Sequence, residues 1–302
     1  MSEANQVRIA YRTAGSTDDW KILRRTGDSL TAGAETTRSD EIRSDRKRGD
    51  QKITTITVGG GVDFEFSAET FDDMLSAAMC SSWETDTPDA GTDQLTVGTD
   101  TTKFDILKSF LDIDEHVLFT DMEVSELQLT LDSGSRVTGS ITFAGEEAET
   151  DYDPSGDTFD DETTTVLMDS SNNLGSILID DSSVDGMCIT GMSLTINNNH
   201  QAGQCVGTQY QYHTKGSSDI TGSKTMRMSS DAFALWENTL LNTPISSEFT
   251  LDDGTTEYRF AIGKEYLSGD LPSGGLDELL TLELSTSVAT DADGETLIIE
   301  RT

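Results

Sequence analysis

Alternation of apolar and polar residues is the most frequent pattern along this chain, and at two places it gives way to helical spacing. Residues 62–66 alternate as a strand does, and apolar residues then recur three or four positions apart within residues 67–79. Residues 224–228 again alternate, and residues 229–241 again have helical spacing. Each place therefore predicts a strand that runs into a short helix. The apolar positions of the two predicted helices are Phe71, Met74, Leu75 and Ala78, and Phe233, Trp236 and Leu240.

Both helices are expected to begin at a serine. Ser67 and Ser229 stand directly before the two segments, and an N-cap serine accepts a hydrogen bond from a backbone N–H that the helix leaves free. Glu69 and Asp231 fall in the first turn, where a negative charge interacts favourably with the helix dipole. These acidic residues therefore have a structural explanation.

The two places belong to a longer internal repeat, whose second copy lies in the second half of the chain. The triplet Ser29-Leu30-Thr31 returns as Ser193-Leu194-Thr195, and Gly60 returns as Gly222. A repeat of this kind indicates two copies of one folding unit. Further matching segments lie beyond the helices at residues 101–106 and 255–260, which are predicted strands, and at 127–143 and 280–300, which are predicted hairpins.

The predicted fold class is mainly β, with two tandem domains, each with one short flanking helix and a long projecting loop. The first domain is expected at residues 1–148 and the second at 186–302. Residues 149–185 are rich in Asp, Ser and Gly, and are expected to form a flexible acidic linker. A chain of 302 residues is long enough for each domain to bury its own core.

The projecting loop of the first copy, at about residues 36–51, is expected to be an arm that docks on a neighbouring subunit. It has almost no apolar residue and cannot form a core. Acidic residues interleave with its basic ones, which weakens any phosphate-binding field. A mildly basic arm suits contact with an acidic copy of the same chain, and the alternative is a merely solvated loop. The candidate contact residues are Arg38, Arg43, Arg46, Lys47 and Arg48.

The charge of the chain is strongly negative and unevenly distributed. The formal net charge is −36, from 56 acidic and 20 basic side chains. Residues 1–52 hold 11 of the basic and 9 of the acidic ones, which leaves 9 basic and 47 acidic in the rest. The body is expected to repel polyanions, so tight binding of DNA or anionic membranes is disfavoured. A saline habitat is an alternative cause of such acidity.

Residue types that carry catalysis are sparse and scattered. His116, His200 and His213 have no nearby serine or cysteine in a nucleophile motif. The glycines at 59–61 do not precede a helix with Lys-Ser or Lys-Thr, so a bulge or a tight turn is expected there rather than a phosphate loop. Neither an enzyme nor a cofactor is predicted. Cys80, Cys188 and Cys205 are odd in number and widely spaced, and are expected to be buried free thiols.

One segment has the spacing of a calcium-binding loop. The pattern runs through Asp151, Asp153, Ser155, Asp157 and Glu162. Pro154 interrupts it, and neither flank has helical periodicity. Solvated acidic residues of the linker are the favoured interpretation, and no metal site is predicted. No run of 18 apolar residues is present, so a membrane-spanning segment is not expected either.

The sequence resembles the tail tube, or major tail, proteins of long-tailed bacteriophages. The resemblance lies in residues 20–27, in residues 38–46 of the predicted arm, in the strand-to-helix junction at 64–75, and in residues 137–143. It implies that each of the two domains is a β-sandwich or small barrel with a flanking helix. The inner strands of these domains would join across subunits to line a channel, and an arm would reach the adjacent ring. It also implies a place in the virion tail after synthesis in the host cytoplasm, and tape measure, tail terminator and distal tail proteins as partners.

Two functions follow as hypotheses. The first is a structural tube subunit, whose two similar domains allow three copies to form a pseudo-hexameric ring, with acidic residues keeping the passing genomic DNA from the wall. The alternative is a calcium-dependent β-module for adhesion or surface binding, suggested by the acidic loop.

Overall fold

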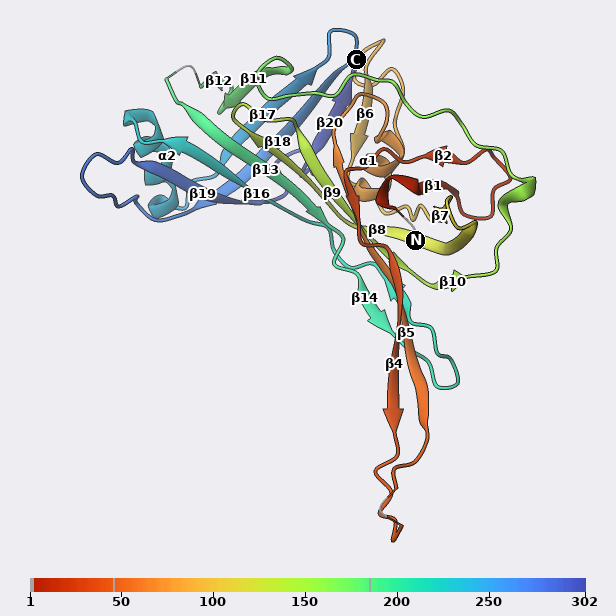
Figure 1. Cartoon of the computed structure of the whole chain (residues 1–302). Coiled ribbons are helices and arrows are strands. Elements are labelled where there is room, and N and C mark those ends of the chain that lie inside the picture. Colours follow the sequence, from red (N-terminus) through yellow and green to blue (C-terminus); the bar gives the residue numbers. More distant parts are fainter. Residues whose placement is uncertain (1–2, 46, 185) are drawn as a thin grey trace.

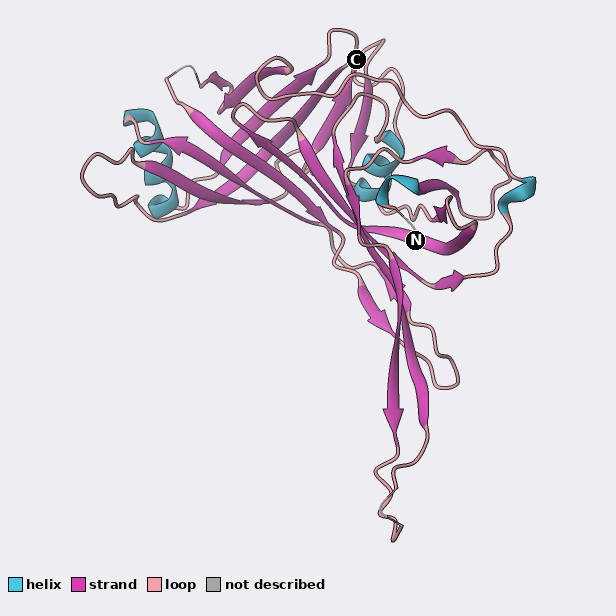
Figure 2. Ribbon diagram, viewed as in Figure 1, coloured by secondary structure: helices cyan, strands magenta, loops and turns pink. Residues whose placement is uncertain are grey.

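The computed structural model describes residues 3–45, 47–184 and 186–302. Long antiparallel strands form most of it, two short α-helices flank them, and one hairpin extends far from the body (Figure 1). Figure 2 shows how strongly strands outweigh helices. The predicted mainly β class is confirmed. The sheets stay open in the described part of the chain, as in a β-sandwich, and do not close into a barrel.

Strand β8 joins two sheet regions in the first half of the chain. Its first part pairs with β7 and β10, and its last part pairs with β9. The change of partner falls between Met122, which pairs with β7, and Glu123, which pairs with β9, and a bulge between Val124 and Glu126 follows directly after it. The strands of this half are β1 (Val7–Thr13), β2 (Lys21–Ile22), β3 (Gly27–Asp28), β4 (Thr31–Arg38), β5 (Gln51–Glu65), β6 (Asp93–Thr96), β7 (Phe104–Phe110), β8 (Glu115–Asp132), β9 (Thr138–Gly145) and β10 (Glu147–Glu149).

The second half continues the same sheet. Strand β13 pairs with the last part of β8, and β16, β19 and β18 follow in that order. Strand β6 of the first half pairs with β20 of the second, so the halves meet at two places. The remaining strands are β11 (Leu174–Ile179), β12 (Ser182–Ser183), β13 (Ile189–Asn197), β14 (Gln201–Gly203), β15 (Tyr212–Thr214), β16 (Asp219–Arg227), β17 (Ile245–Asp252), β18 (Glu257–Ser268), β19 (Thr281–Val288) and β20 (Ile298–Arg301).

The predicted second hairpin at 280–300 is not formed. Strand β19 pairs with β16 and β18, whereas β20 pairs with β18 and β6. A turn closed by the bond from the Asp291 N–H to the Glu295 carbonyl oxygen lies between β19 and β20. This turn carries the chain to the other part of β18, where the edge next to Tyr258–Ala261 is free to accept β20. The hairpin of β8 and β9 is formed as predicted.

One large hydrophobic core extends through both halves. The ring of Phe64 stacks on that of Phe71 at 4.1 Å, and Phe66 meets Tyr258 of the second half edge to face at 5.5 Å. A smaller cluster lies under the second helix and includes Met226, Leu235, Leu282 and Leu284. The two halves therefore share buried surface instead of forming two separate cores.

The two helices begin differently. Helix α2 (Ser230–Leu241) is capped by Ser229, whose hydroxyl oxygen accepts from the Ala232 N–H at 3.1 Å, as predicted. Helix α1 (Asp72–Met79) starts five residues after Ser67, and Phe71 is its N-cap residue without a side-chain bond. Ser67 was therefore the wrong N-cap prediction. Its hydroxyl donates to the Thr70 hydroxyl at 2.8 Å, within the turn that precedes the helix.

The helices also differ in what covers them. All four predicted apolar residues of α1 are buried. In α2, Phe233 is 39% exposed and Leu240 is 69% exposed, so the prediction of a packed face is wrong for these two residues. The reason is the position of the helices. Helix α1 lies between the halves, whereas α2 lies at the outer end of the second half (Figure 1).

Residues 149–185 were predicted to be a flexible linker, but its described part, residues 149–184, is hydrogen-bonded along the first half. The Trp20 N–H donates to Thr158 and the Asp160 N–H to Trp20, both at 2.9 Å. Met168 is fully buried and exchanges backbone bonds with Phe66 and Val137. The segment contains the 3-10 helix η2 (Pro154–Gly156), and its end forms β11, which pairs with β17. It thus belongs to both halves.

Candidate assembly surfaces

The most prominent surface is the hairpin of β4 and β5, which we call the arm (residues 31–57). Every residue of β4 is exposed, and along β5 the first buried residue is Val58. No apolar core supports such a strand pair, because its side chains are mostly Thr, Ala, Gly and charged residues. Residues 36–51, the predicted arm, form the far end of this hairpin (Figure 1).

The basic residues of the arm are placed at its end and are partly paired there. The Arg38 guanidinium donates to the Gln51 amide oxygen at 3.1 Å. Arg43 donates twice to the Asp45 carboxylate, at 3.3 and 3.2 Å. Lys47 and Arg48 are exposed, and Arg46 lies outside the described residues. The local pairing leaves a tip of mixed charge.

The base of the arm is held by a loop of the second half, residues 198–218, which carries β14 and β15. The Ile56 N–H donates to Gln209 at 2.7 Å, and the Gln211 N–H donates back to Ile56 at 3.2 Å. The Gln204 amide donates to Thr54 at 2.8 Å. This loop follows the repeated Ser193-Leu194-Thr195 and is the second polar excursion of the sequence, so both excursions lie together.

A second surface is the solvent-facing side of the shared sheet, which we call the hydroxyl face. The opposite side carries core residues such as Ile141 and Leu194. Two cross-strand rows extend over six strands, and each contains one carboxylate and otherwise only Ser, Thr or Gln. The first row is Asp63, Ser140, Gln128, Thr195, Thr221 and Ser287, and the second is Glu65, Thr138, Thr130, Ser193, Ser223 and Ser285.

Sequence reasoning missed the hydroxyl face, although a signal for it exists. In β13 and β16 the polar member of each alternating pair is mostly Ser or Thr rather than Asp or Glu. Such a choice is conspicuous in a chain with 56 acidic residues. The rows become visible only when the register joins the strands. Ser193 and Ser223, for example, lie opposite each other with their hydroxyl oxygens 2.8 Å apart.

The residues of the predicted calcium loop do not converge. The Asp157 carboxylate accepts from the Trp20 indole N–H at 2.9 Å and from the Tyr152 hydroxyl at 2.6 Å. Asp153 accepts from the Ser155 N–H at the start of η2, and this bond lowers the pKa of Asp153. Asp151 is exposed. Within residues 3–45, 47–184 and 186–302, no group of three or more His, Cys, Asp or Glu side chains is arranged to hold a metal ion.

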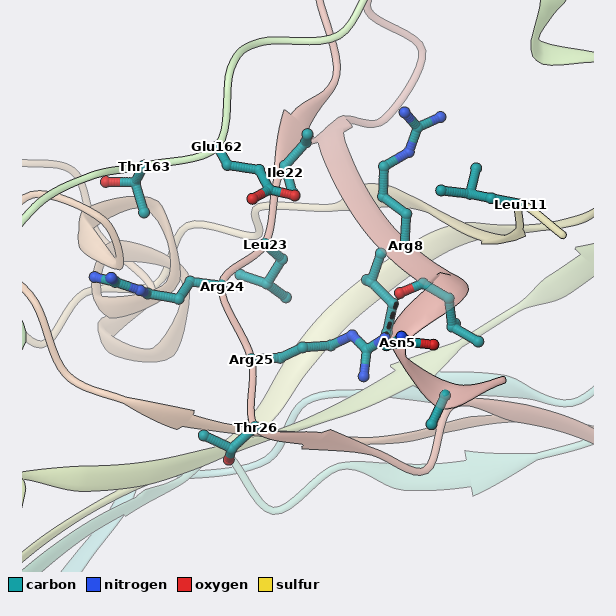
Figure 3. Close-up of a pocket in the computed structure, with 13 residues that line it drawn as sticks. Asn5, Arg8, Ile22, Leu23, Arg24, Arg25, Thr26, Leu111, Glu162 and Thr163 are labelled. Atoms are coloured by element: carbon teal, nitrogen blue, oxygen red, sulfur yellow. Dashed lines mark hydrogen bonds between the residues drawn. The ribbon is translucent and has the colours of Figure 1, made fainter. Parts of the chain in front are cut away.

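Glu162, the last residue of that loop pattern, lines a cavity beside β1 and β2 instead. Figure 3 shows it in this cavity with Arg8 and Arg25. Arg25 donates to the Val7 carbonyl oxygen at 2.5 Å and is ion-paired with Asp28 at 3.1 Å. Burial lowers the pKa of Arg8, whose guanidinium lies 3.7 Å from the Phe159 ring centre. Arg8 therefore packs against the predicted linker segment through Phe159, whereas the bonds of Arg25 stay within the first half.

The three cysteines carry free thiols, but the prediction that all are buried is wrong. Cys80 is buried, whereas Cys188 and Cys205 are exposed. Cys80 lies directly after α1 in the core, while the other two lie in loops at the edges of β13 and β14. In the part of the chain that the structure describes, no helix has the length and apolar character to cross a membrane.

A mainly β chain with a long exposed arm and a wide hydroxyl face has the features of a structural protein that assembles with other copies. The family model for phage tail tube proteins matches residues 4–290 of the 302. The chain therefore belongs to the phage tail tube protein family. It is a structural subunit of the tail tube and is located in the virion tail. The comparison with curated proteins found no match. Proteins of this family assemble with themselves and with other tail proteins and are typically not enzymes.

Proposed function

We propose that three copies of this chain form a ring with pseudo-sixfold shape, and that stacked rings form the channel through which the genomic DNA passes. The observation that carries this proposal is the repeated order of strand pairing. In the first half, β1, β7, β8, β9, β5 and β4 pair in that order. In the second, β11, β17, β18, β19, β16 and β13 do so.

The flanking elements support the same two units. In each half the helix follows the strand that carries the repeated glycine, β5 or β16, and precedes the outer strand β7 or β17, with β6 intervening only in the first half. Strands β10 and β20 both return to the first part of the long strand of their half. This pairing modifies the predicted equivalences, because β17 and not β18 corresponds to β7. The second unit then starts at β11, within residues 149–185.

The hydroxyl face is the wall of the channel in this proposal. Its rows combine uncharged side chains with a single carboxylate each, Asp63 or Glu65, and Glu126 and Glu283 add further negative charge. Basic side chains would bind phosphates and release their counterions, which would retain DNA. A hydroxyl wall with sparse carboxylates has no such attraction. The acidic residues elsewhere keep the outside of the tube soluble.

The arm connects one ring to the next. Its strands are long and its sides lack an apolar core, so a neighbouring ring gives it the partner surface that its own chain lacks. The tip residues Arg43, Lys47 and Arg48 fit an acidic neighbour in the next ring. The terminal rings are expected to offer the same surfaces to tape measure, terminator and distal tail proteins.

Electron cryomicroscopy of tubes made from the purified protein tests this proposal. We expect stacked rings in which three chains form six similar wedges, with the hydroxyl face towards the bore and the arms between rings. A ring of six chains, or a bore lined by the other side of the sheet, would contradict it. The calcium-dependent alternative receives no support from the Asp151 to Glu162 segment, because its carboxylates bind Trp20, Tyr152 and Ser155.

A further inference from the structure

The ladders of the second half repeat those of the first in register. Thr31 lies opposite Gly59 between β4 and β5, and Thr195 lies opposite Thr221 between β13 and β16. Glu123 lies opposite Ala144 between β8 and β9, and Tyr266 lies opposite Ser287 between β18 and β19. Counting along the strands from these matched pairs gives each residue of one half a counterpart in the other half.

The same correspondence relates the residues at the junction between the halves to residues on the two outer edges of the sheet. At the junction, β8 and β13 lie side by side, and the Asn198 N–H donates to the Ser125 carbonyl oxygen at 2.9 Å. The counterpart of the bulged pair Ser125 and Glu126 is Ser268 at the end of β18, because Ser268 pairs with Ser285 where these two residues share the place opposite Thr142. Ser125 is the member of that pair whose carbonyl oxygen accepts from Asn198. The counterpart of Asn198 is Ala34, in the middle of β4.

Both counterparts lie on open edges in the described part of the chain. Strand β4 pairs only with β5, and Ser268 pairs only with Ser285 of β19. An exposed edge strand is a template for pairing with another chain. The end of β18 in one copy could therefore pair with the free edge of β4 in the next copy, in the same way that β8 pairs with β13 within the chain.

The helices give a second, independent indication. The Asn198 amide donates to the Ala78 carbonyl oxygen at 3.1 Å, so the second half covers α1. The counterpart of Ala78 in α2 is Leu240. Leu240 and Leu241 are 69% and 72% exposed, whereas Ala78 and Met79, at the same positions of α1, are buried. Four more exposed leucines follow in the loop after β18, at positions 271, 276, 279 and 280.

We infer that Ser268 and the outer face of α2 of one copy bind the β4 edge of the next copy, with Ala34 opposite Ser268 and close to Leu240. The partner is a second copy of this chain, because the surface repeats an interface that the chain already makes with itself. The contact is head to tail, and such a contact gives a ring when the rotation from one copy to the next closes, as in the proposed ring. This inference rests on the proposed ring and specifies which residues meet in it.

The backbone ladder between β18 of one copy and β4 of the next is expected to be short. The stretch corresponding to residues 126–132 of β8 is 269–275, which contains Gly269, Pro272, Gly274 and Gly275 and is not a strand. Proline has no N–H to donate to a ladder. The exposed leucines of α2 and the following loop therefore provide more of the contact than backbone pairing does.

Engineered disulfide cross-linking tests the register. The variant carries Ala34→Cys and Ser268→Cys in a background with Cys188→Ser and Cys205→Ser. Its two new cysteines should form a disulfide between neighbouring copies in assembled tubes. Directly opposite residues have Cα atoms about 4.5–5.5 Å apart, within the range of about 4.4–6.8 Å for a disulfide. Non-reducing electrophoresis of oxidised tubes should show covalent multimers ending at the trimer.

The matched control is Glu35→Cys with Ser268→Cys, because the neighbouring side chain of a strand points to the other face. Each single cysteine variant serves as a second control. Cross-linking of the Ala34 pair and not of the Glu35 pair supports the inference. Equal cross-linking of both pairs, or none in variants that still form tubes, overturns it and leaves the proposed tube function intact. Failure of the unmodified chain to form rings would instead refute the proposed function.

A second test addresses α2. Leu240→Asp with Leu241→Asp should abolish ring formation, measured by analytical ultracentrifugation, and should leave the thermal unfolding of the monomer unchanged because both side chains are already exposed. Val166→Asp, an exposed apolar residue far from α2 in the sequence, is the control and should still form rings. Rings of normal size from the double variant would overturn the inference.

Discussion

The ammonium group of Lys224 is ion-paired with the carboxylate of Glu265 inside the second half of the protein, where the side chains are 5% and 0% exposed. Their counterparts in the first half, Val62 and Met122, are both fully buried apolar residues. The same position thus holds a charged pair in one unit and an apolar pair in the other. A buried pair loses solvation that its mutual attraction barely offsets, whereas breaking it leaves one charge without a partner.

Replacing one partner of this pair should be costly, and replacing both should not. Lys224→Val or Glu265→Met alone is expected to lower the free energy of unfolding by about 3–5 kcal/mol. The double variant, which copies the first half, should unfold at a urea concentration equal to or above that of the original protein. If each single variant were as stable as the double, the pair would not be desolvated as described.

Gly60 lies against the backbone of Ser29, and its replacement should destabilise the sheet. A Cβ atom on Gly60 would come within 2.3 Å of the Ser29 carbonyl oxygen, and its φ of 132° is unfavourable for other residues. At Gly222, the counterpart, a Cβ would meet the Ser193 carbonyl oxygen at 2.2 Å. Alanine at either site should lower the free energy of unfolding by more than about 1 kcal/mol. Gly33→Ala is the control, because nothing lies within 4 Å of its Cβ position.

Charge reversal at the tip of the arm should block stacking without affecting the fold. Glutamate in place of Arg43, Arg46, Lys47 and Arg48 would bring negative tips to an acidic neighbour. We expect single rings or monomers in electron micrographs, with an unchanged circular dichroism spectrum. Lysine at the three arginine positions keeps the charge and should still give tubes. Normal tubes from the glutamate variant would show that tip charge has no role in stacking.

Positive charge on the hydroxyl face should hinder DNA passage. Ser140→Lys with Thr195→Lys places two ammonium groups in one cross-strand row, where they would bind phosphates. Phage carrying this variant should assemble normal tails and release their DNA more slowly in an ejection assay, with the delay reduced at high salt. The glutamine variants at both positions add similar bulk without charge. An equal delay for lysine and glutamine would point to bulk and not to charge.

Much of the local structure could be predicted from the sequence because it depends on neighbouring residues. The alternation before residues 67 and 229 gave strands, and the cap at Ser229 was identified because capping involves residues only three positions apart. The bulge or tight turn expected at residues 59–61 is not formed, because β5 continues through them and pairs with β9 without a register shift. The polar arm was recognised because it has nothing to bury.

Predictions that depended on partners distant in the sequence were less successful. A periodic apolar face shows that a helix has a side to bury but not what covers it, so the exposed Phe233 and Leu240 could not be distinguished from the buried residues of α1. The acidic residues 151–162 looked solvated, whereas Asp157 binds Trp20, which is 137 positions away. The partner of β20 was also assigned wrongly, because strand pattern does not specify which edge is open.

The sequence by itself determined the β class, the strand-to-helix junctions, the repeated segments and an arm without a core, since each follows from local periodicity and composition. Only the tertiary structure decided which strands pair, because pairing depends on register and on the edges left free by the rest of the sheet. It also brought Ser and Thr residues from six strands onto one face and left the outer face of α2 uncovered at the outer end of the second half. The proposed contact between copies, with Ala34 opposite Ser268, follows from that arrangement.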